Sequence, residues 1–130
     1  MTPFPPGRTK IRLAVGDVVL EGELDGTACA RAIADALPIA ARAQRWGDEF
    51  YFEIPVARAL DETATARVRV GDLGYWPTGK ALCVFFGPTP MSTGNEPVPA
   101  SEVNLVGRVS GELRALKEMR GELVVRVEKR

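Results

Sequence analysis

The sequence predicts a mainly β chain in which many short strands close, or nearly close, into a barrel with two short helices capping its ends. Three observations support this prediction: runs of alternating apolar and polar residues, Gly-Asp pairs that recur between those runs, and two short stretches with helical spacing. A barrel removes exposed strand edges, and a two-sheet sandwich is the alternative architecture. The length of 130 residues fits a single domain.

The first half of the chain predicts a hairpin, a helix and a further pair of strands. Residues 1–9 are rich in proline and are expected to be a flexible segment before a domain that spans residues 10–130. The pairs Gly16-Asp17 and Gly47-Asp48 are typical of tight turns between strands, and Pro38 ends the helical pattern. In order, the expected elements are strands over 10–15 and 18–24, a helix over 28–37, and strands over 39–46 and 49–54.

The second half predicts further short strands around one long loop. The stretch Pro77-Thr-Gly-Lys80 indicates a hairpin tip. Residues 87–101 are rich in Pro, Ser, Gly and Asn, and irregular segments of that length are often functional. In order, the expected elements are strands over 67–70, 73–76 and 81–86, the loop over 87–101, a strand over 103–109, a helix over 112–119 and a strand over 123–127.

Composition excludes several classes of function. The chain has no histidine, which removes Ser-His-Asp triads, Cys-His pairs and His-based zinc sites within one chain. Lys plus Arg and Asp plus Glu both number 17, so no basic excess indicates a nucleic-acid partner. Cys29 and Cys83 lie far apart in apolar surroundings and are expected to be buried and free. Neither a metal site nor a cofactor is predicted.

The sequence also predicts a cytoplasmic location. Its first residues lack the basic stretch and apolar run of a secretory signal. No apolar segment approaches the roughly 20 residues that cross a bilayer, so no membrane partner is expected.

Three motifs resemble those of a family of small, mostly uncharacterised prokaryotic proteins with a cyclophilin-like fold. They are Arg45-Trp-Gly-Asp-Glu-Phe-Tyr-Phe-Glu-Ile-Pro55, Gly71-Asp-Leu-Gly-Tyr-Trp-Pro-Thr-Gly79 and Phe85-Phe-Gly-Pro-Thr-Pro90. The resemblance spans residues 10–128 and implies a closed cyclophilin-like barrel of about eight strands with a helix at each end. It implies no known reaction, because the biochemical role of the family is unsettled.

Cyclophilins proper are prolyl isomerases, so the resemblance raises isomerase activity as an alternative hypothesis. Arg45, followed five, six and eight residues later by Phe50, Tyr51 and Glu53, is similar to the cyclophilin spacing of Arg, Phe, Met and Gln. The sequence departs from that pattern at Glu53, where a charge replaces an amide, and it lacks the Phe-His-Arg motif. Arg45 is the candidate catalytic residue of this hypothesis.

The main hypothesis is the binding of a small molecule or an extended, proline-containing peptide in an aromatic groove. The groove would form between residues 46–53, the turn at 75–76 and the loop over 87–101. Aromatic walls with a few polar groups are typical of such sites. The candidate ligand-binding residues are Trp46, Glu49, Tyr51, Glu53, Tyr75, Trp76, Lys80, Phe86 and Thr89.

Other interpretations of the same residues stay open. Asp48, Glu49 and Glu53 are close enough in sequence to divide acid and base roles, or they are simply solvated, with Glu49 closing a turn. Tyr75 and Trp76 either line the groove or only stabilise a turn. The aromatic residues could instead form the interface of an interaction module or a homo-oligomer. The alternation leaves open which face of each strand points outward, and the choice among these interpretations depends on it.

Overall fold

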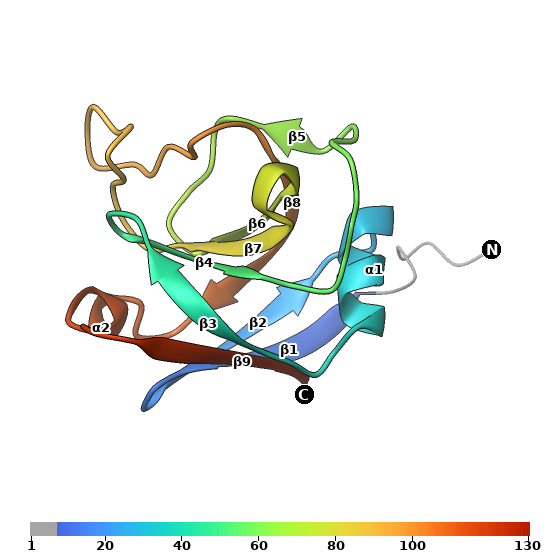
Figure 1. Cartoon of the computed structure of the whole chain (residues 1–130), viewed down its shortest axis with the longest axis horizontal. Helices are drawn as coiled ribbons and strands as arrows, with labels where there is room; N and C mark the ends of the chain where they lie inside the picture. Colours follow the sequence, from blue (N-terminus) through green and yellow to red (C-terminus); the bar gives the residue numbers. More distant parts are fainter. Residues whose placement is uncertain (1–7) are drawn as a thin grey trace.

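A computed structural model describes residues 8–130 and shows a β-barrel with two short helices (Figure 1). Its strands are β1 (Thr9–Val15), β2 (Val18–Leu24), β3 (Ile39–Arg45), β4 (Glu49–Glu53), β5 (Ala64–Thr65), β6 (Asp72–Trp76), β7 (Ala81–Phe85), β8 (Val103–Ser110) and β9 (Leu123–Lys129). Its helices are α1 (Ala28–Asp35) and α2 (Arg114–Lys117), and a 3-10 turn, η1 (Pro77–Gly79), joins β6 to β7.

The pairing of β2 with β8 closes the barrel. Neighbouring strands follow the order β2-β1-β9-β3-β4-β7-β6-β8, and four antiparallel residue pairs, from Glu21↔Ser110 to Leu24↔Gly107, join the last strand to the first. The two-residue β5 lies outside this ring and pairs only with the start of β8. The closing pairs confirm the predicted barrel and rule out the two-sheet sandwich.

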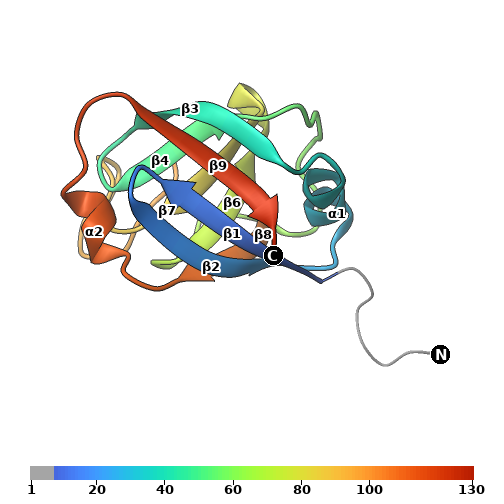
Figure 2. The same cartoon turned by 90° about the horizontal axis from the view of Figure 1, so that it is seen from below.

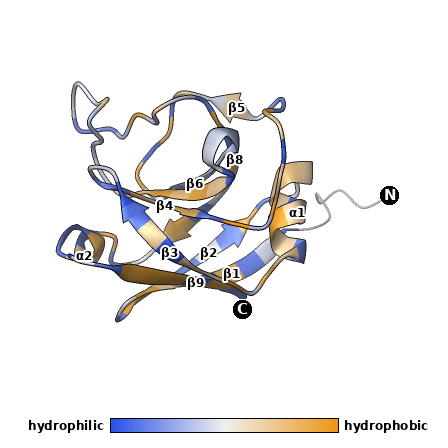
Figure 3. Cartoon of the chain, in the orientation of Figure 1, coloured by the Kyte–Doolittle hydropathy of each residue, from blue (hydrophilic) through white to orange (hydrophobic). Residues whose placement is uncertain are grey.

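The helices lie at opposite ends of the barrel (Figure 2). The hydroxyl of Thr27 caps α1 by accepting a hydrogen bond from the Ala30 N–H at 3.3 Å. In Figure 3, α1 carries hydrophobic and hydrophilic positions in turn, and Ile33 is among the side chains that it buries. At the other end, Leu116 of α2 is fully buried in the same core. The helices thereby cover the apolar side chains that the open ends of a barrel would expose to water.

A second apolar cluster lies on the outer face of the barrel. Successive side chains of a strand point to opposite faces, so Leu82 and Val84 of β7 enter the barrel core while Cys83 and Phe85 point outward. The outward pair is nonetheless buried, because Val68, Val103 and the half-buried Tyr51, Trp76 and Leu105 pack around it. The barrel wall here has apolar layers on both sides, and the candidate site described below lies in the outer layer.

The structure corrects the prediction of a strand over residues 67–70. The Asp72 carboxylate accepts a hydrogen bond from the Arg69 N–H at 2.8 Å, and the Asp72 N–H donates to the Arg69 carbonyl at 2.9 Å. These bonds fold the segment into a turn, and Val68 is the side chain that it buries. A strand pairing nearby, β5, was not predicted because two residues carry no detectable alternation.

Further boundaries differ from the prediction. The helix expected over 28–37 ends at Asp35. The helix expected over 112–119 is limited to Arg114–Lys117, since Leu113 and Glu118 are only its flanking residues. Thr9, expected in a flexible segment, is the first residue of β1 and pairs with Leu24. The remainder of that expected segment, residues 1–7, lies outside the described residues.

The closing seam predicts a strong effect of Gly107→Ala. A Cβ at Gly107 would meet the carbonyl oxygen of Glu23 on β2, so the two backbones would have to separate. We expect a loss of about 1–3 kcal/mol in the free energy of unfolding, as is typical of overpacking. Urea unfolding measures it, with Gly94→Ala as the control, because a Cβ at Gly94 meets nothing within 4 Å. Equal stabilities of the two variants would contradict the prediction.

Candidate functional site

A cavity of ≈ 160 Å³ opens in the outer apolar layer, and we call it the Glu49 cavity. Its volume is close to that of an engineered protein cavity of about 150 Å³ that binds benzene. Most of its lining is apolar or aromatic. The lining residues are Trp46, Glu49, Tyr51, Trp76, Cys83, Pro99, Ala100 and Val103.

Strand geometry places the floor and one corner of this cavity. Glu49 and Tyr51 share the outer face of β4. Phe50 and Phe52, which alternate with them along the strand, are buried in the barrel core. Antiparallel pairing of β4 with β7 sets Cys83 directly opposite Tyr51. Trp76, the last residue of β6, meets the Tyr51 ring edge to face, with ring centroids 6.0 Å apart and planes at 79°.

Glu49 is the chemically unusual group of the cavity. Only 5% of the residue is exposed, and its Oε1 atom has no hydrogen-bond partner among the described residues. Burial raises the pKa of Glu49 to about 7, although a hydrogen bond from the Cys83 thiol opposes part of that rise. Near neutral pH, the cavity therefore holds a carboxyl group that can exist with or without its proton.

Cys83 supports this carboxyl group and is not itself reactive. Burial, and then the negative charge of Glu49, raise the pKa of the Cys83 thiol well above its ordinary value. A thiol in that state remains protonated, and the thiolate is the nucleophilic form of cysteine. Cys83 therefore acts in the cavity as a weak hydrogen-bond donor.

The turn between β3 and β4 is held by Arg45. Its guanidinium Nε donates to the Gly47 carbonyl and its Nη2 to the Asp48 carboxylate, both at 2.8 Å. The third nitrogen, Nη1, donates to carbonyl groups at the end of α2, with the shortest bond, of 3.0 Å, to Met119. The same group lies over the Phe86 ring, 5.3 Å from its centroid. All three nitrogens of Arg45 therefore act inside the fold.

The long loop over residues 86–102 follows β7, and its first residues are hydrogen-bonded to this turn. The Asp48 N–H donates to the Pro88 carbonyl, and the Phe86 N–H donates to the Asp48 carbonyl, both at 2.9 Å. In Figure 1 the loop, coloured gold to orange, passes the β3–β4 turn and continues toward β5. Near its end, Ser101 accepts a hydrogen bond from the Trp76 indole N–H at 2.7 Å. That bond fixes the end of the loop against β6. The preceding loop residues, Pro99 and Ala100, line the cavity.

The structure brings together four of the residues that the sequence analysis selected: Trp46, Glu49, Tyr51 and Trp76. Three others have different surroundings. The Tyr75 side chain is inside the barrel, where its hydroxyl donates to the Val56 carbonyl at 2.6 Å. Phe86 is buried against Phe50, with ring centroids 5.0 Å apart. The Thr89 hydroxyl donates to the Val98 carbonyl and so holds the long loop together.

Glu53 and Lys80 lie apart from the cavity. Glu53 is exposed at the far end of β4, and Lys80 is an exposed residue after η1 with a left-handed φ of 47°. The cavity lining also includes four residues that the sequence pattern did not indicate: Cys83, Pro99, Ala100 and Val103. The alternation of β7 could have indicated Cys83, because it shares an outward face with Phe85, but only the pairing with β4 sets it beside Glu49.

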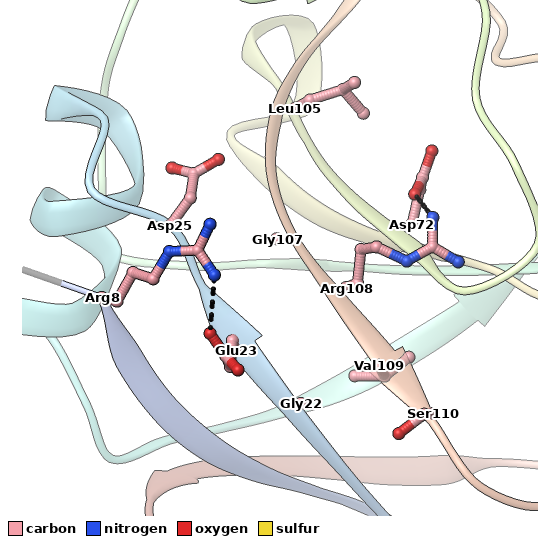
Figure 4. A pocket seen from close by; sticks show the side chains of 10 residues that line it. All are labelled: Arg8, Gly22, Glu23, Asp25, Asp72, Leu105, Gly107, Arg108, Val109 and Ser110. Atoms are coloured by element: carbon pink, nitrogen blue, oxygen red, sulfur yellow. Dashed lines mark hydrogen bonds and ion pairs between the residues drawn. The ribbon is translucent and has the colours of Figure 1, made fainter. Parts of the chain in front are cut away.

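A larger groove crosses the seam between β2 and β8, and its charged groups already have partners. Figure 4 shows Arg8 paired with Glu23 at 3.2 Å and Arg108 paired with Asp72 at 2.6 Å. Asp25, also in this groove, accepts hydrogen bonds from the N–H and hydroxyl of Thr27. No orphan buried side chain lies in the groove among residues 8–130, so it offers a ligand less than the Glu49 cavity does.

Two structural features are absent from the described residues. Residues 8–130 contain no group of three or more Cys, Asp or Glu side chains placed to hold a metal ion. Within the same range, no helix has the length and apolar character needed to cross a bilayer.

Comparisons with known proteins agree with the architecture. Residues 9–128 match the family described as Cyclophilin-like. The solution structure of the hypothetical protein AF2241 from Archaeoglobus fulgidus is 39% identical in sequence, with a TM-score of 0.78 over 95% of this chain and 96% of that one. The structure of McbB in complex with tryptophan is 16% identical, with a TM-score of 0.66 over 92% of this chain and 44% of that one, and it is similar in fold alone. No match was found among curated proteins.

The buried carboxyl group predicts a pH-dependent gain in stability for Glu49→Gln. In the unfolded wild-type chain Glu49 ionises near its ordinary pKa of 4.5, but in the folded chain its pKa is about 7. The unfolded state therefore loses its proton first, and wild-type stability falls as the pH rises from 4.5 to about 7, then levels off. Relative to wild type, the variant should gain about 3 kcal/mol between pH 4.5 and pH 8.

Urea unfolding at both pH values measures this gain, with Glu53→Gln on the exposed end of the same strand as the control. A stability difference between Glu49→Gln and wild type that stays constant with pH would contradict the assigned burial of the carboxyl group.

The bonds of Arg45 predict a structural role for this residue. Arg45→Ala removes the charge-assisted bonds that join the β3–β4 turn to the end of α2, so we expect a loss of about 2 kcal/mol in unfolding free energy. Arg42→Ala is the matched control, because its ion pair with Glu122 is exposed and should contribute less than about 1 kcal/mol. Thermal or urea unfolding compares the two variants, and equal losses would refute this role.

Proposed function

The chain belongs to the Cyclophilin-like family, and we propose that it is a ligand-binding member of that family whose Glu49 cavity takes one small molecule. The ligand has an apolar body that fits between Trp46, Tyr51 and Trp76. It also carries a hydrogen-bond donor that reaches the Oε1 atom of Glu49.

The observation that supports this proposal most directly is the orphan Oε1 of Glu49. A buried polar atom without a partner costs about 1–3 kcal/mol relative to a satisfied one. Here the unsatisfied atom belongs to a residue that lines a cavity and is 5% exposed. A ligand that donates a hydrogen bond to Oε1 would remove this penalty. The free energy recovered in this way would add to the affinity of the ligand.

The walls of the cavity support an apolar ligand body. Tyr51 and Trp76 meet nearly at right angles and form a corner of two aromatic rings. Ring-to-ring contacts with a ligand contribute about 0.5–1.5 kcal/mol beyond the area that they bury. The volume of ≈ 160 Å³ limits that body to about one ring. The protein McbB, which is similar in fold alone, has a structure in complex with tryptophan.

Two other hypotheses have less support. Isomerase catalysis by Arg45 would need a guanidinium donor directed at a peptide, whereas its three nitrogens donate to Gly47, Asp48 and the end of α2. An interaction module would use Tyr51 and Trp76 as an exposed patch, whereas both are half-buried beside a cavity. A cytoplasmic location stays a prediction, in keeping with the two free cysteines.

Trp76→Ala tests the proposed binding. The two tryptophans of the chain both line the cavity, so fluorescence reports on its occupancy directly. In a fragment screen, we expect hits of one-ring size to change this fluorescence, and Trp76→Ala to weaken their binding about tenfold, or about 1.4 kcal/mol. Val124→Ala, an exposed apolar position on β9, should leave binding unchanged.

Light scattering on the same proteins separates a cavity from an interface. If wild type and Trp76→Ala are both monomeric, the result supports the proposal. A wild-type oligomer that Trp76→Ala dissociates, together with an absence of fragment hits, would instead favour the interaction module.

A further inference from the structure

The charges around the Glu49 cavity indicate which class of ligand it accepts. Glu49 is the only carboxyl group among the described residues of the lining, and none of those residues is a lysine or arginine. Two cations beside the neighbouring β3–β4 turn are already engaged: Arg45 bonds Asp48 at 2.8 Å, and Lys117 lies 3.5 Å from the other oxygen of Asp48. An ionised Glu49 therefore has no counter-charge in the cavity, and a ligand must bring one.

The groups that face Glu49 from the surrounding elements are neutral. From β7, Cys83 contributes a thiol whose proton is retained, and from β4, Tyr51 contributes a phenol ring. From β6, the Trp76 indole N–H is engaged by Ser101 of the loop. Val103 of β8 and Pro99 and Ala100 of the loop are apolar. Nothing in this shell would attract an anion, and the carboxylate would repel one.

The aromatic walls add a second reason to expect a cation. The faces of tryptophan and tyrosine rings carry negative charge density, and they attract ammonium groups within about 6 Å. Trp46, Tyr51 and Trp76 line the same cavity as Glu49. A carboxylate set among aromatic rings is complementary to an ammonium group that carries an apolar substituent.

We propose, resting on the ligand-binding function above, that the Glu49 cavity is selective for a small protonated amine with an apolar body of about one ring. Its ammonium group donates to Oε1 of Glu49, and its body lies against Trp46, Tyr51 and Trp76. A carboxyl group that is protonated before binding gives its proton to the solvent as the ammonium enters. The bound state is then a neutral pair of opposite charges inside the apolar layer.

This proposal is tested with three probes of one shape and different charge: benzylamine, benzyl alcohol and benzoate. Tryptophan fluorescence and calorimetry at pH 8 give their affinities for the full chain. We expect benzylamine to bind at least tenfold more tightly than benzyl alcohol, and benzoate not to bind. Lowering the pH from 8 to 6 should weaken benzylamine about tenfold, because Glu49, with a pKa of about 7, becomes protonated while the amine keeps its charge. Benzyl alcohol should change less than twofold.

Two variants assign the effect to Glu49. Glu49→Gln keeps the shape of the side chain, so it should bind benzyl alcohol like wild type but lose both the preference for benzylamine and its pH dependence. Glu53→Gln, at the exposed end of the same strand, should behave as wild type.

The outcomes separate this inference from the proposed function. If benzyl alcohol or benzoate binds wild type as tightly as benzylamine does, selectivity for amines is overturned while ligand binding stands. If none of the three probes binds, the amine inference is overturned, and the fragment screen described above decides whether the proposed function falls with it.

Discussion

The guanidinium group of Arg45 is the contact on which the candidate site depends. It joins three parts of the chain that are distant in sequence: the β3–β4 turn, the end of α2 and the aromatic pair Phe50 and Phe86. Donors that all find acceptors in a partly buried setting give a fixed geometry as well as stability. The turn that Arg45 holds leads directly into β4, whose first residue, Glu49, lines the cavity in the outer layer.

That outer layer explains how a small barrel obtains a cavity without opening its core. The barrel interior is packed with aliphatic and aromatic side chains, as protein interiors generally are. The second layer lies between the wall and an irregular loop, and a loop follows no repeating geometry that would fill space evenly. The cavity therefore lies where regular and irregular structure meet, and its polar group is held by the regular side.

Sequence reasoning was most successful where local geometry decides. The alternation of β4 predicts that Glu49 and Tyr51 share a face, and the structure has that arrangement. The same rule shows why Tyr75 and Trp76 cannot both line one cavity, since neighbours in a strand point to opposite sides. The sequence does not predict the rest of the lining. Strand register brings Cys83 to the cavity, and an irregular loop brings Pro99 and Ala100 to it. Those features arise from contacts between distant segments, for which one sequence carries no local signal.

The contact between Gly87 and Asp48 has a consequence for how this sequence can change. A Cβ at Gly87 would strike the Asp48 side chain, and the Asp48 backbone bonds both Phe86 and Pro88. Substitutions at these two positions are therefore epistatic: the effect of one depends on the residue present at the other. The motifs around Arg45 and Phe85, separated by some forty residues of chain, are therefore expected to change together rather than independently.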